Sequence, residues 1–115
     1  MGTNFANAEF NVGVSSDLLA ISNCLKPDYM AEASSTIDIN GVQFYEFSGT
    51  DVGAGNYYQV ESYRTLHNNS CYVIDLVIHS VNIYNYPKEF EVKPFDYSKI
   101  HNLLLLMLQS FKFSN

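Results

Sequence analysis

Two cysteines and three histidines are the residues of this chain best suited to nucleophilic chemistry. Cys24 or Cys71 would need a histidine base and an orienting carboxylate to act as a nucleophile. His67, His79 and His101 are available as bases. However, no nucleophile motif surrounds either cysteine, and Cys71 is predicted to begin a strand rather than a helix, whose N-terminus would favour the thiolate. We therefore assign no catalytic residue.

A metal site built from His67, Asp75 and His79 fails on spacing. Asp75 and His79 share one face of a predicted strand but are four residues apart, which is about 13 Å along a strand. A single ion cannot be bound by two side chains so far apart. Two cysteines are also too few for a zinc site made mainly of thiolates. The sequence therefore indicates no metal ion and no cofactor.

The two cysteines are instead candidates for a disulfide. A bond between Cys24 and Cys71 would close a loop of about 48 residues and stabilise the fold by about 4 kcal/mol on the chain-entropy model. A composition with few lysines and many Asn, Ser and Tyr residues is typical of exported proteins, in which disulfides persist. The alternative is a pair of independent buried thiols in a reducing cytosol.

Arg64, the only arginine, has two candidate roles. The predicted register places it diagonally from Asp75 on the next strand, where the two side chains could form an ion pair that fixes the register. Alternatively, its guanidinium could hold a ligand carboxylate through paired hydrogen bonds. Glu61 falls on the core-facing side of the same strand, and we expect it to lie near a sheet edge with its carboxylate in water.

The glycine-rich segment 48–55 could in principle cradle an anion through its backbone N–H groups. It lacks the lysine and the serine or threonine that end a phosphate-binding loop, and Asp51 within it would repel a phosphate. We therefore predict a flexible loop between two strands.

Tyrosine clustering is the strongest binding signal in the sequence. Tyr and Asn together form adaptable interaction surfaces. A polar-aromatic loop at 81–95, with two prolines and room for a short edge strand, would present Tyr84 and Tyr86 to a partner. The alternative is that these tyrosines are ordinary sheet aromatics. The predicted binding residues are Asp51, Tyr58, Arg64, His67, His79, Tyr84 and Tyr86.

These residues depend on predicted strands for their positions. Residues 8–15 alternate as a strand does, and a short helical turn over 17–21 follows. Residues 24–33, which contain Pro27 and Asp28, are predicted to be a connection. A hairpin over 36–47 turns at Asn40-Gly41, the preferred pair for a type I′ turn, because both central residues need a positive φ. This turn pairs Ile39 with Val42 and Ile37 with Phe44.

Segments 56–66 and 71–80 form a second predicted hairpin. A tight turn at Asn68-Asn69 places Leu66 opposite Cys71 and Arg64 opposite Val73. In the strand at 71–80 both faces carry apolar residues, which indicates a central position in the sheet.

A C-terminal helix is the clearest element of the sequence. Asp96 is a natural N-cap, and apolar residues follow at the spacing of one helix face. They are Ile100, Leu103, Leu104, Met107, Leu108 and Phe111. Because Leu105 and Leu106 widen this stripe, we expect the helix, from about Asp96 to Phe111, to be buried on more than one side. Residues 111–113 are expected to fold back as a short tail. The predicted fold is α+β, with an antiparallel sheet of about five strands and the helix packed on one face.

Length and charge restrict the class of protein. The 115 residues fit a single domain, which could be a fragment that lacks an N-terminal targeting segment. The net charge is −6, and residues 1–60 account for it with seven acids against Lys26 alone. An acidic surface repels phosphate backbones, so nucleic acid is excluded as a partner. No apolar run approaches the roughly 18 residues of a membrane span.

Several short motifs, spread over most of the chain, together carry a resemblance to other proteins. They are Gly2-Thr3-Asn4-Phe5, the hairpin 39–44, Ala54-Gly55-Asn56-Tyr57-Tyr58, the segment 63–68, Cys71-Tyr72, Ile78-His79-Ser80, Asn85-Tyr86-Pro87 and Ser110-Phe111-Lys112-Phe113. In these motifs the chain resembles uncharacterised small bacterial domains that are often exported or lipid-anchored. A strand-rich body followed by a helix that ends in Ser-Phe is also similar to the PsbP-like α+β fold. That resemblance implies a non-enzymatic assembly or binding module.

The sequence thus predicts a non-catalytic extracytoplasmic binding or assembly module, periplasmic or at the cell surface. Its partner would be a protein or a glycan, met by the loops at 48–56 and 81–95. One alternative is a small-ligand carrier with a pocket between helix and sheet, and another is an unrecognised hydrolase. A cytoplasmic location and the oligomeric state stay open.

Overall fold

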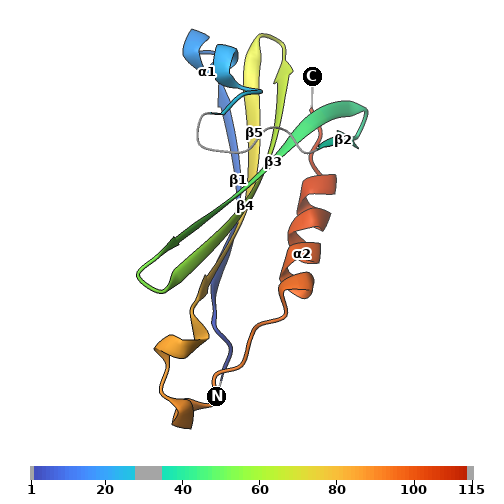
Figure 1. Cartoon of the computed structure of the whole chain (residues 1–115). Coiled ribbons are helices and arrows are strands. Elements are labelled where there is room, and N and C mark those ends of the chain that lie inside the picture. The colour runs from blue at the N-terminus through green and yellow to red at the C-terminus, as the bar shows by residue number, and fades with distance from the viewer. Residues whose placement is uncertain (1, 28–34, 114–115) are drawn as a thin grey trace.

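A computed structural model describes residues 2–27 and 35–113 of the chain. Five antiparallel strands form one sheet in the order β1-β5-β4-β3-β2. The strands are β1 (Phe5–Ser15), β2 (Ser35–Ile39), β3 (Val42–Gly53), β4 (Asn56–His67) and β5 (Ser70–Val81). The long helix α2 (Tyr97–Gln109) lies along one face of this sheet (Figure 1). The predicted α+β class and five-stranded sheet are therefore confirmed.

Both predicted hairpins have the expected register. Asn40 and Gly41 have φ values of 50° and 88°, and Ile39 and Phe44 pair with Val42 and Ile37. Asn68 and Asn69 likewise adopt positive φ at the second turn, where Leu66 pairs with Cys71. Asparagine tolerates this left-handed conformation better than other non-glycine residues, which explains why both turns form at asparagines.

The predicted loop at 48–55 is wrong, because β3 continues through Gly53 and pairs with β4 from Tyr45 to Gly53. Only Ala54 and Gly55 form the turn, with φ values of 51° and 81°. The segment is extended because β4 offers hydrogen-bond partners to the backbone N–H and C=O groups that face it, and this pairing outweighs the low strand propensity of glycine. Figure 1 shows the resulting hairpin projecting from the body of the sheet. Asp51 therefore lies in a strand, and no anion cradle forms there.

The core lies between α2 and the sheet face that we call the helix face. Leu104 and Leu108 of α2 are buried against Phe44, Ile74 and Leu76 of the strands. Phe111 and Phe113 pack against the same cluster as the predicted tail. The expectation that α2 is buried on more than one side is wrong. Its outer positions Leu103, Leu106 and Met107 are exposed because they point away from the sheet face on which Leu104 and Leu108 pack.

The opposite sheet face, here called the back face, carries a short helix at one end. This helix, α1 (Leu18–Asn23), overlaps the turn predicted over 17–21 and extends beyond it, and Asp17 before it makes no side-chain capping bond. Cys24 follows it and forms a disulfide with Cys71 at the start of β5, with a Cα–Cα distance of 5.7 Å. The predicted disulfide is thus present. Of the predicted connection at 24–33, the part beyond Pro27 lies outside the described residues.

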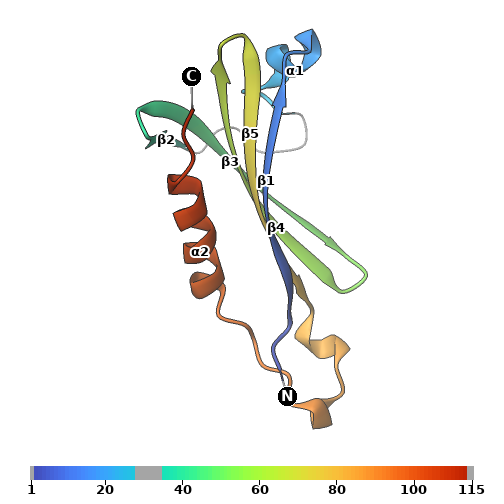
Figure 2. The same cartoon turned by 180° about the vertical axis from the view of Figure 1, so that it is seen from behind.

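The segment after β5 contains two 3-10 turns, η1 (Ile83–Asn85) and η2 (Lys88–Phe90). The edge strand considered for this region reduces to a single bridge between Thr3 and Lys93. Asn4 closes the segment, since its side chain donates to the Val81 carbonyl at 2.9 Å and accepts from the Phe95 N–H at 3.0 Å. Figure 2 shows this region at the end of the sheet opposite α1.

Candidate functional site

A row of polar and aromatic residues crosses four strands of the back face. Asn7 of β1 pairs with His79 of β5, His79 with Tyr58 of β4, and Tyr58 with Asp51 of β3. Cross-strand partners have their side chains on the same face of a sheet. We call Asn7, His79, Tyr58 and Asp51 the distal row, because they lie toward the end of the sheet away from α1. Three of the seven predicted binding residues therefore meet in one row.

The two rings of the distal row hold each other in place. Tyr58 and His79 stack with centroids 4.2 Å apart and an interplanar angle of 14°. Nε2 of His79 donates to Oδ1 of Asn56 at 2.8 Å, which fixes the imidazole in the plane of the stack. Both rings are half-buried, whereas Asp51 and Asn7 beside them are exposed. The result is a preformed aromatic platform with an exposed carboxylate at one side and an exposed amide at the other.

The back face is acidic. Its register places four carboxylates on it, from Glu9, Asp38, Asp51 and Asp75, against the single base Arg64. Arg64 is buried, with 8% of its surface exposed. Oδ1 of Asp75 is buried and makes no hydrogen bond. Asp51 belongs to the distal row and Glu9 is two residues from Asn7 on β1, so the electrostatic field near the row favours a positively charged group.

Arg64 lies on the same face as the distal row but nearer α1. Its Nε donates to Oγ of Ser62 at 2.9 Å, and its guanidinium lies 5.9 Å from the centroid of the Phe47 ring. Arg64 therefore bonds to a serine on its own strand. The prediction had paired it with Asp75 on the neighbouring strand β5.

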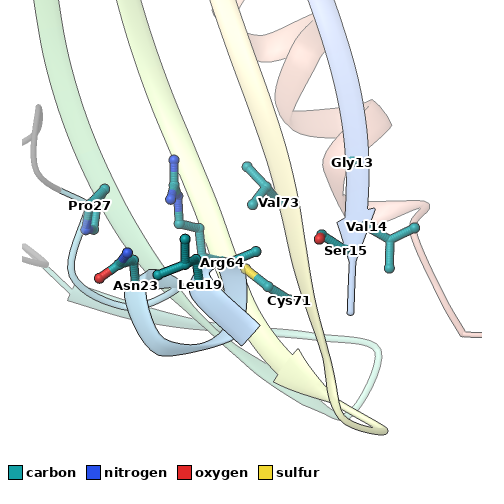
Figure 3. Close-up of a pocket in the computed structure, with 10 residues that line it drawn as sticks. Gly13, Val14, Ser15, Leu19, Asn23, Pro27, Arg64, Cys71 and Val73 are labelled. Carbon is teal, nitrogen blue, oxygen red and sulfur yellow. The ribbon is translucent and has the colours of Figure 1, made fainter. Parts of the chain in front are cut away.

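Beside Arg64 is a pocket of about 510 Å³ between α1 and the back face (Figure 3). Leu19 of α1, Val73 of β5 and Cys71 of the disulfide line it together with Arg64. This pocket lies between α1 and the back face. The ligand pocket considered from the sequence would have been on the other face, between α2 and the sheet. The pocket beside Arg64 is apolar apart from a few polar groups, which is the usual composition of a small-molecule site.

The other predicted binding residues lie elsewhere. His67 is on the helix face, where it stacks on Phe113 with centroids 3.8 Å apart. Tyr84 is 90% exposed in η1, and Tyr86 follows it. A backbone bond of 2.7 Å from Asn82 to Gly55 ties this segment to the β3–β4 turn, so both tyrosines are at the same end of the sheet as the distal row.

A cluster of titratable side chains on the helix face was not anticipated. Glu61 accepts a hydrogen bond from the Tyr63 hydroxyl at 2.7 Å and another from Nε2 of His101 at 2.7 Å. Tyr97 stacks on His101 with centroids 5.2 Å apart. Glu61 is therefore not at a sheet edge with its head in water, because α2 brings a donor to it. The polar His101 within the apolar stripe of α2 was the signal that could have revealed this contact.

The electrostatics of this cluster follow from burial. Burial raises the pKa of Tyr63 far above its ordinary value, and the hydrogen bond to Glu61 and its charge add to the shift. Burial is also the main cause that raises the pKa of Tyr97, and the charges of the nearby Glu61 and Tyr57 raise it further. Both phenols therefore stay protonated at neutral pH, and the bond from His101 to Glu61 links α2 to β4.

Neither cysteine can act as a nucleophile in this state, because both sulfurs are held in the disulfide. Within residues 2–27 and 35–113, no group of three or more His, Cys, Asp or Glu side chains gathers to hold a metal ion. In the same ranges, no helix has both the length and the apolar character that crossing a bilayer requires. No family model, curated protein or solved structure matches the chain. Function must therefore be argued from the geometry.

Proposed function

We propose that this protein is a non-catalytic binding module that works outside the cytoplasm, with the distal row as its contact site. The observation that carries the proposal is the stacked Tyr58–His79 pair, held by Asn56 and flanked by the exposed Asp51. Rigid aromatic side chains lose little conformational entropy on binding and are enriched at interaction surfaces. Such an arrangement supports recognition rather than bond breaking, because Nε2 of His79 is already bonded to Asn56 and the row contains no serine or cysteine.

Charge favours a protein partner with basic side chains over a neutral glycan. Glu9 and Asp51 are exposed on the back face, and Arg64, the only lysine or arginine among the strand residues of that face, is buried. Opposite charges speed encounter and select the partner, and a lysine or arginine side chain can also lie against the Tyr58 ring. The partner we propose therefore presents a basic patch to the distal row.

The disulfide supports a location outside the cytoplasm. Cys24 and Cys71 are bonded, and such bonds persist in oxidising compartments such as the periplasm or the cell surface. The resemblance to PsbP-like modules, which mostly assemble or bind, agrees with the same proposal.

The test uses the isotopically labelled chain and a lysine-rich decapeptide as the probe. Two-dimensional NMR should show amide shifts confined to the strands around Asp51, Tyr58 and His79, and the affinity should fall as salt is added. Asp51→Asn should weaken binding by about two- to fivefold, the range of an exposed ion pair. Asp17→Asn is the matched control, since Asp17 is an exposed acid beside α1 with no side-chain capping bond.

Equal losses in the two variants would mean that only the net charge attracts the peptide, and the site would be wrong. Shifts at the same residues with a neutral oligosaccharide, insensitive to salt, would replace the basic partner by a glycan. No shift with either probe would refute the distal row as a binding site.

A second candidate function, a small-ligand carrier, is supported by the pocket beside α1. Its walls are mainly apolar and its volume of about 510 Å³ is within the usual range for ligand sites. Decanoate is a suitable probe, because its chain fits apolar walls and its carboxylate carries the group that Arg64 would bind. Amide shifts at Val73 and Ala20, abolished by the pocket-filling change Ala20→Phe, would favour a carrier. Unchanged spectra at millimolar decanoate would exclude it.

A further inference from the structure

The outer edge of β1 is a long strand edge with little protection. β1 ends the strand order, so its outer edge pairs with no other strand that the structure describes. Natural edge strands are usually protected from pairing with other chains by charges, prolines or bulges. Over its 11 residues β1 has one charged side chain, Glu9, no proline, and an irregularity only between Phe5 and Asn7. The remaining edge, from Ala8 to Ser15, is a regular template for another strand.

An exposed apolar surface adjoins this edge on the helix face. Val12 and Val14 of β1 are 52% and 61% exposed. On α2, Leu103, Leu106 and Met107 are 53%, 64% and 47% exposed. We call these five residues the β1 flank. Isolated exposed apolar residues are common, but several of them near an unpaired strand edge indicate an interaction site.

The orientation of α2 places its exposed residues beside β1. His101 bonds to Glu61 on β4, so the side of the helix that carries His101 is turned toward β4. Residues 103 and 107 are one turn apart on the other side of the helix, given its 3.6-residue period. α2 also contacts β5 and β1, and β1 lies beyond β5 from β4. Leu103 and Met107 therefore face the β1 side of the molecule.

The chain exposes more surface than a monomer of its mass needs. Its accessible area is 7529 Å² at 13.0 kDa, whereas monomeric proteins of that mass expose about 6,300 Å². Its radius of gyration is 16.4 Å, against about 13 Å for a compact chain of this length. A stable dimer buries about 800 Å² on each partner. The excess of about 1,200 Å² is therefore enough for one such interface.

We propose that two copies of this chain associate through the outer edges of β1, with a two-fold axis perpendicular to the sheet. The two edges then run antiparallel and join the two sheets into one, and both α2 helices lie on the same face. Leu103 and Met107 of each copy approach the seam, where they cover Val12 and Val14 of both copies. Of the possible registers, only one centred on Glu9 itself would oppose two carboxylates, because Glu9 is the only charge on β1.

The dimer does not depend on the proposed partner site. The distal row lies on the back face, which the helix-face contacts of the dimer leave uncovered. Each copy carries a net charge of −6, so the copies repel each other over long distances. Salt screens this repulsion, and association should therefore strengthen as the salt concentration rises. A partner held by charge at the distal row has the opposite salt dependence, which separates the two proposals.

Sedimentation equilibrium of the full chain over a hundredfold range of concentration tests the dimer. The average mass should rise from 13.0 kDa toward twice that value, at lower concentration in high salt than in low salt. Val12→Lys places a charge on the edge and should weaken the dimer at least tenfold. Leu103→Lys should do the same from a different element, which keeps the test valid if one variant folds poorly. Val52→Lys is the matched control, because Val52 is an equally exposed strand valine at 65%, near the β3–β4 turn.

A wild-type chain that stays monomeric at every concentration and salt level would overturn the proposal and leave the β1 flank to a different partner. A dimer whose dissociation constant is the same in Val12→Lys and wild type would also overturn it. Equal weakening by Val52→Lys would show that added charge alone disrupts association, again contrary to a β1 interface. Circular dichroism of each variant verifies that the fold is intact.

Discussion

Removal of the Cys24–Cys71 bond should cost this fold about 4 kcal/mol. The bond links residues 47 positions apart, and closing a loop of this length lowers the entropy of the unfolded chain by about 14 cal/mol/K. For 115 residues the entropy of unfolding is about 240 cal/mol/K. Dividing the cost of about 4 kcal/mol by this entropy of unfolding gives a fall in Tm of about 17 °C for Cys24→Ala/Cys71→Ala. Because small domains are stable by about 5 to 15 kcal/mol, the double variant should still fold.

Differential scanning calorimetry of the oxidised wild type, the reduced wild type and the double variant measures this effect. Reductant should lower the Tm of the wild type to that of the variant and leave the variant unchanged. Alanine is preferred to serine because Cys24 and Cys71 are both buried, and a serine hydroxyl there would add a desolvation cost of its own. If the Tm falls by less than about 5 °C, the loop-entropy reasoning is refuted.

The loss should also be felt locally at α1. This helix has six residues and none is buried, and so short a helix is not stable by itself. Hydrogen exchange of the reduced protein should therefore show α1 unprotected while β4 and β5 stay protected. Protection of α1 that survives reduction would mean that its contacts with the back face, rather than the disulfide, hold it in place.

Three further changes test separate parts of the fold. Burial, and then the bond to Glu61, raise the pKa of Tyr63, so from pH 10.0 upward the unfolded chain loses a proton that the folded chain keeps. Above pH 10.0 the free energy of unfolding should fall by up to about 1.4 kcal/mol per pH unit. Urea titrations of Tyr63→Phe at several pH values should show a shallower fall. A slope equal to that of the wild type would contradict the role given to Tyr63. The Asn40 side chain donates to the carbonyl of Gln109 at the end of α2, at 3.1 Å, and to that of Phe111 just beyond it, at 2.6 Å. Asn40→Gly keeps the positive φ but should cost about 1 to 2 kcal/mol in urea denaturation, and a loss below about 0.3 kcal/mol would show these bonds to be inert. Gly55→Ala should lower the Tm, because Gly55 has φ 81° and a Cβ there would run into the Asn85 side chain; an unchanged Tm would mean that Asn85 moves aside at no cost.

The local elements of this fold could be predicted because neighbouring residues specify them. Asn40-Gly41 and Asn68-Asn69 favour the positive φ of tight turns, and once a turn is placed the register of its hairpin follows. Asp96 caps α2 as expected, since its Oδ1 accepts from the Lys99 N–H at 3.2 Å. The segment 48–55 was missed for the same reason, because its glycines favour a loop locally and only pairing with β4 makes it extended.

The candidate site divides in a similar way. Asp51, Tyr58 and His79 could be selected one by one from their chemistry. That they form one row depends on β3 extending to Gly53 and on the register of β4 with β5. Asn7 joins the row because β1 pairs with β5 from the opposite end of the chain. No local pattern connects these segments, so the sequence provided candidates and the sheet brought three of them together.

The sequence by itself determined the fold class, the two hairpins, the C-terminal helix and the cysteines that could bond, because turn residues, periodicity and composition act over short distances along the chain. Only the tertiary structure decided which of these surfaces are covered. It placed Glu61 against His101, left the outer side of α2 exposed, and put β1 at the edge of the sheet. Burial and strand order depend on contacts between residues far apart in sequence, and these contacts are fixed only when the whole sheet and α2 have assembled.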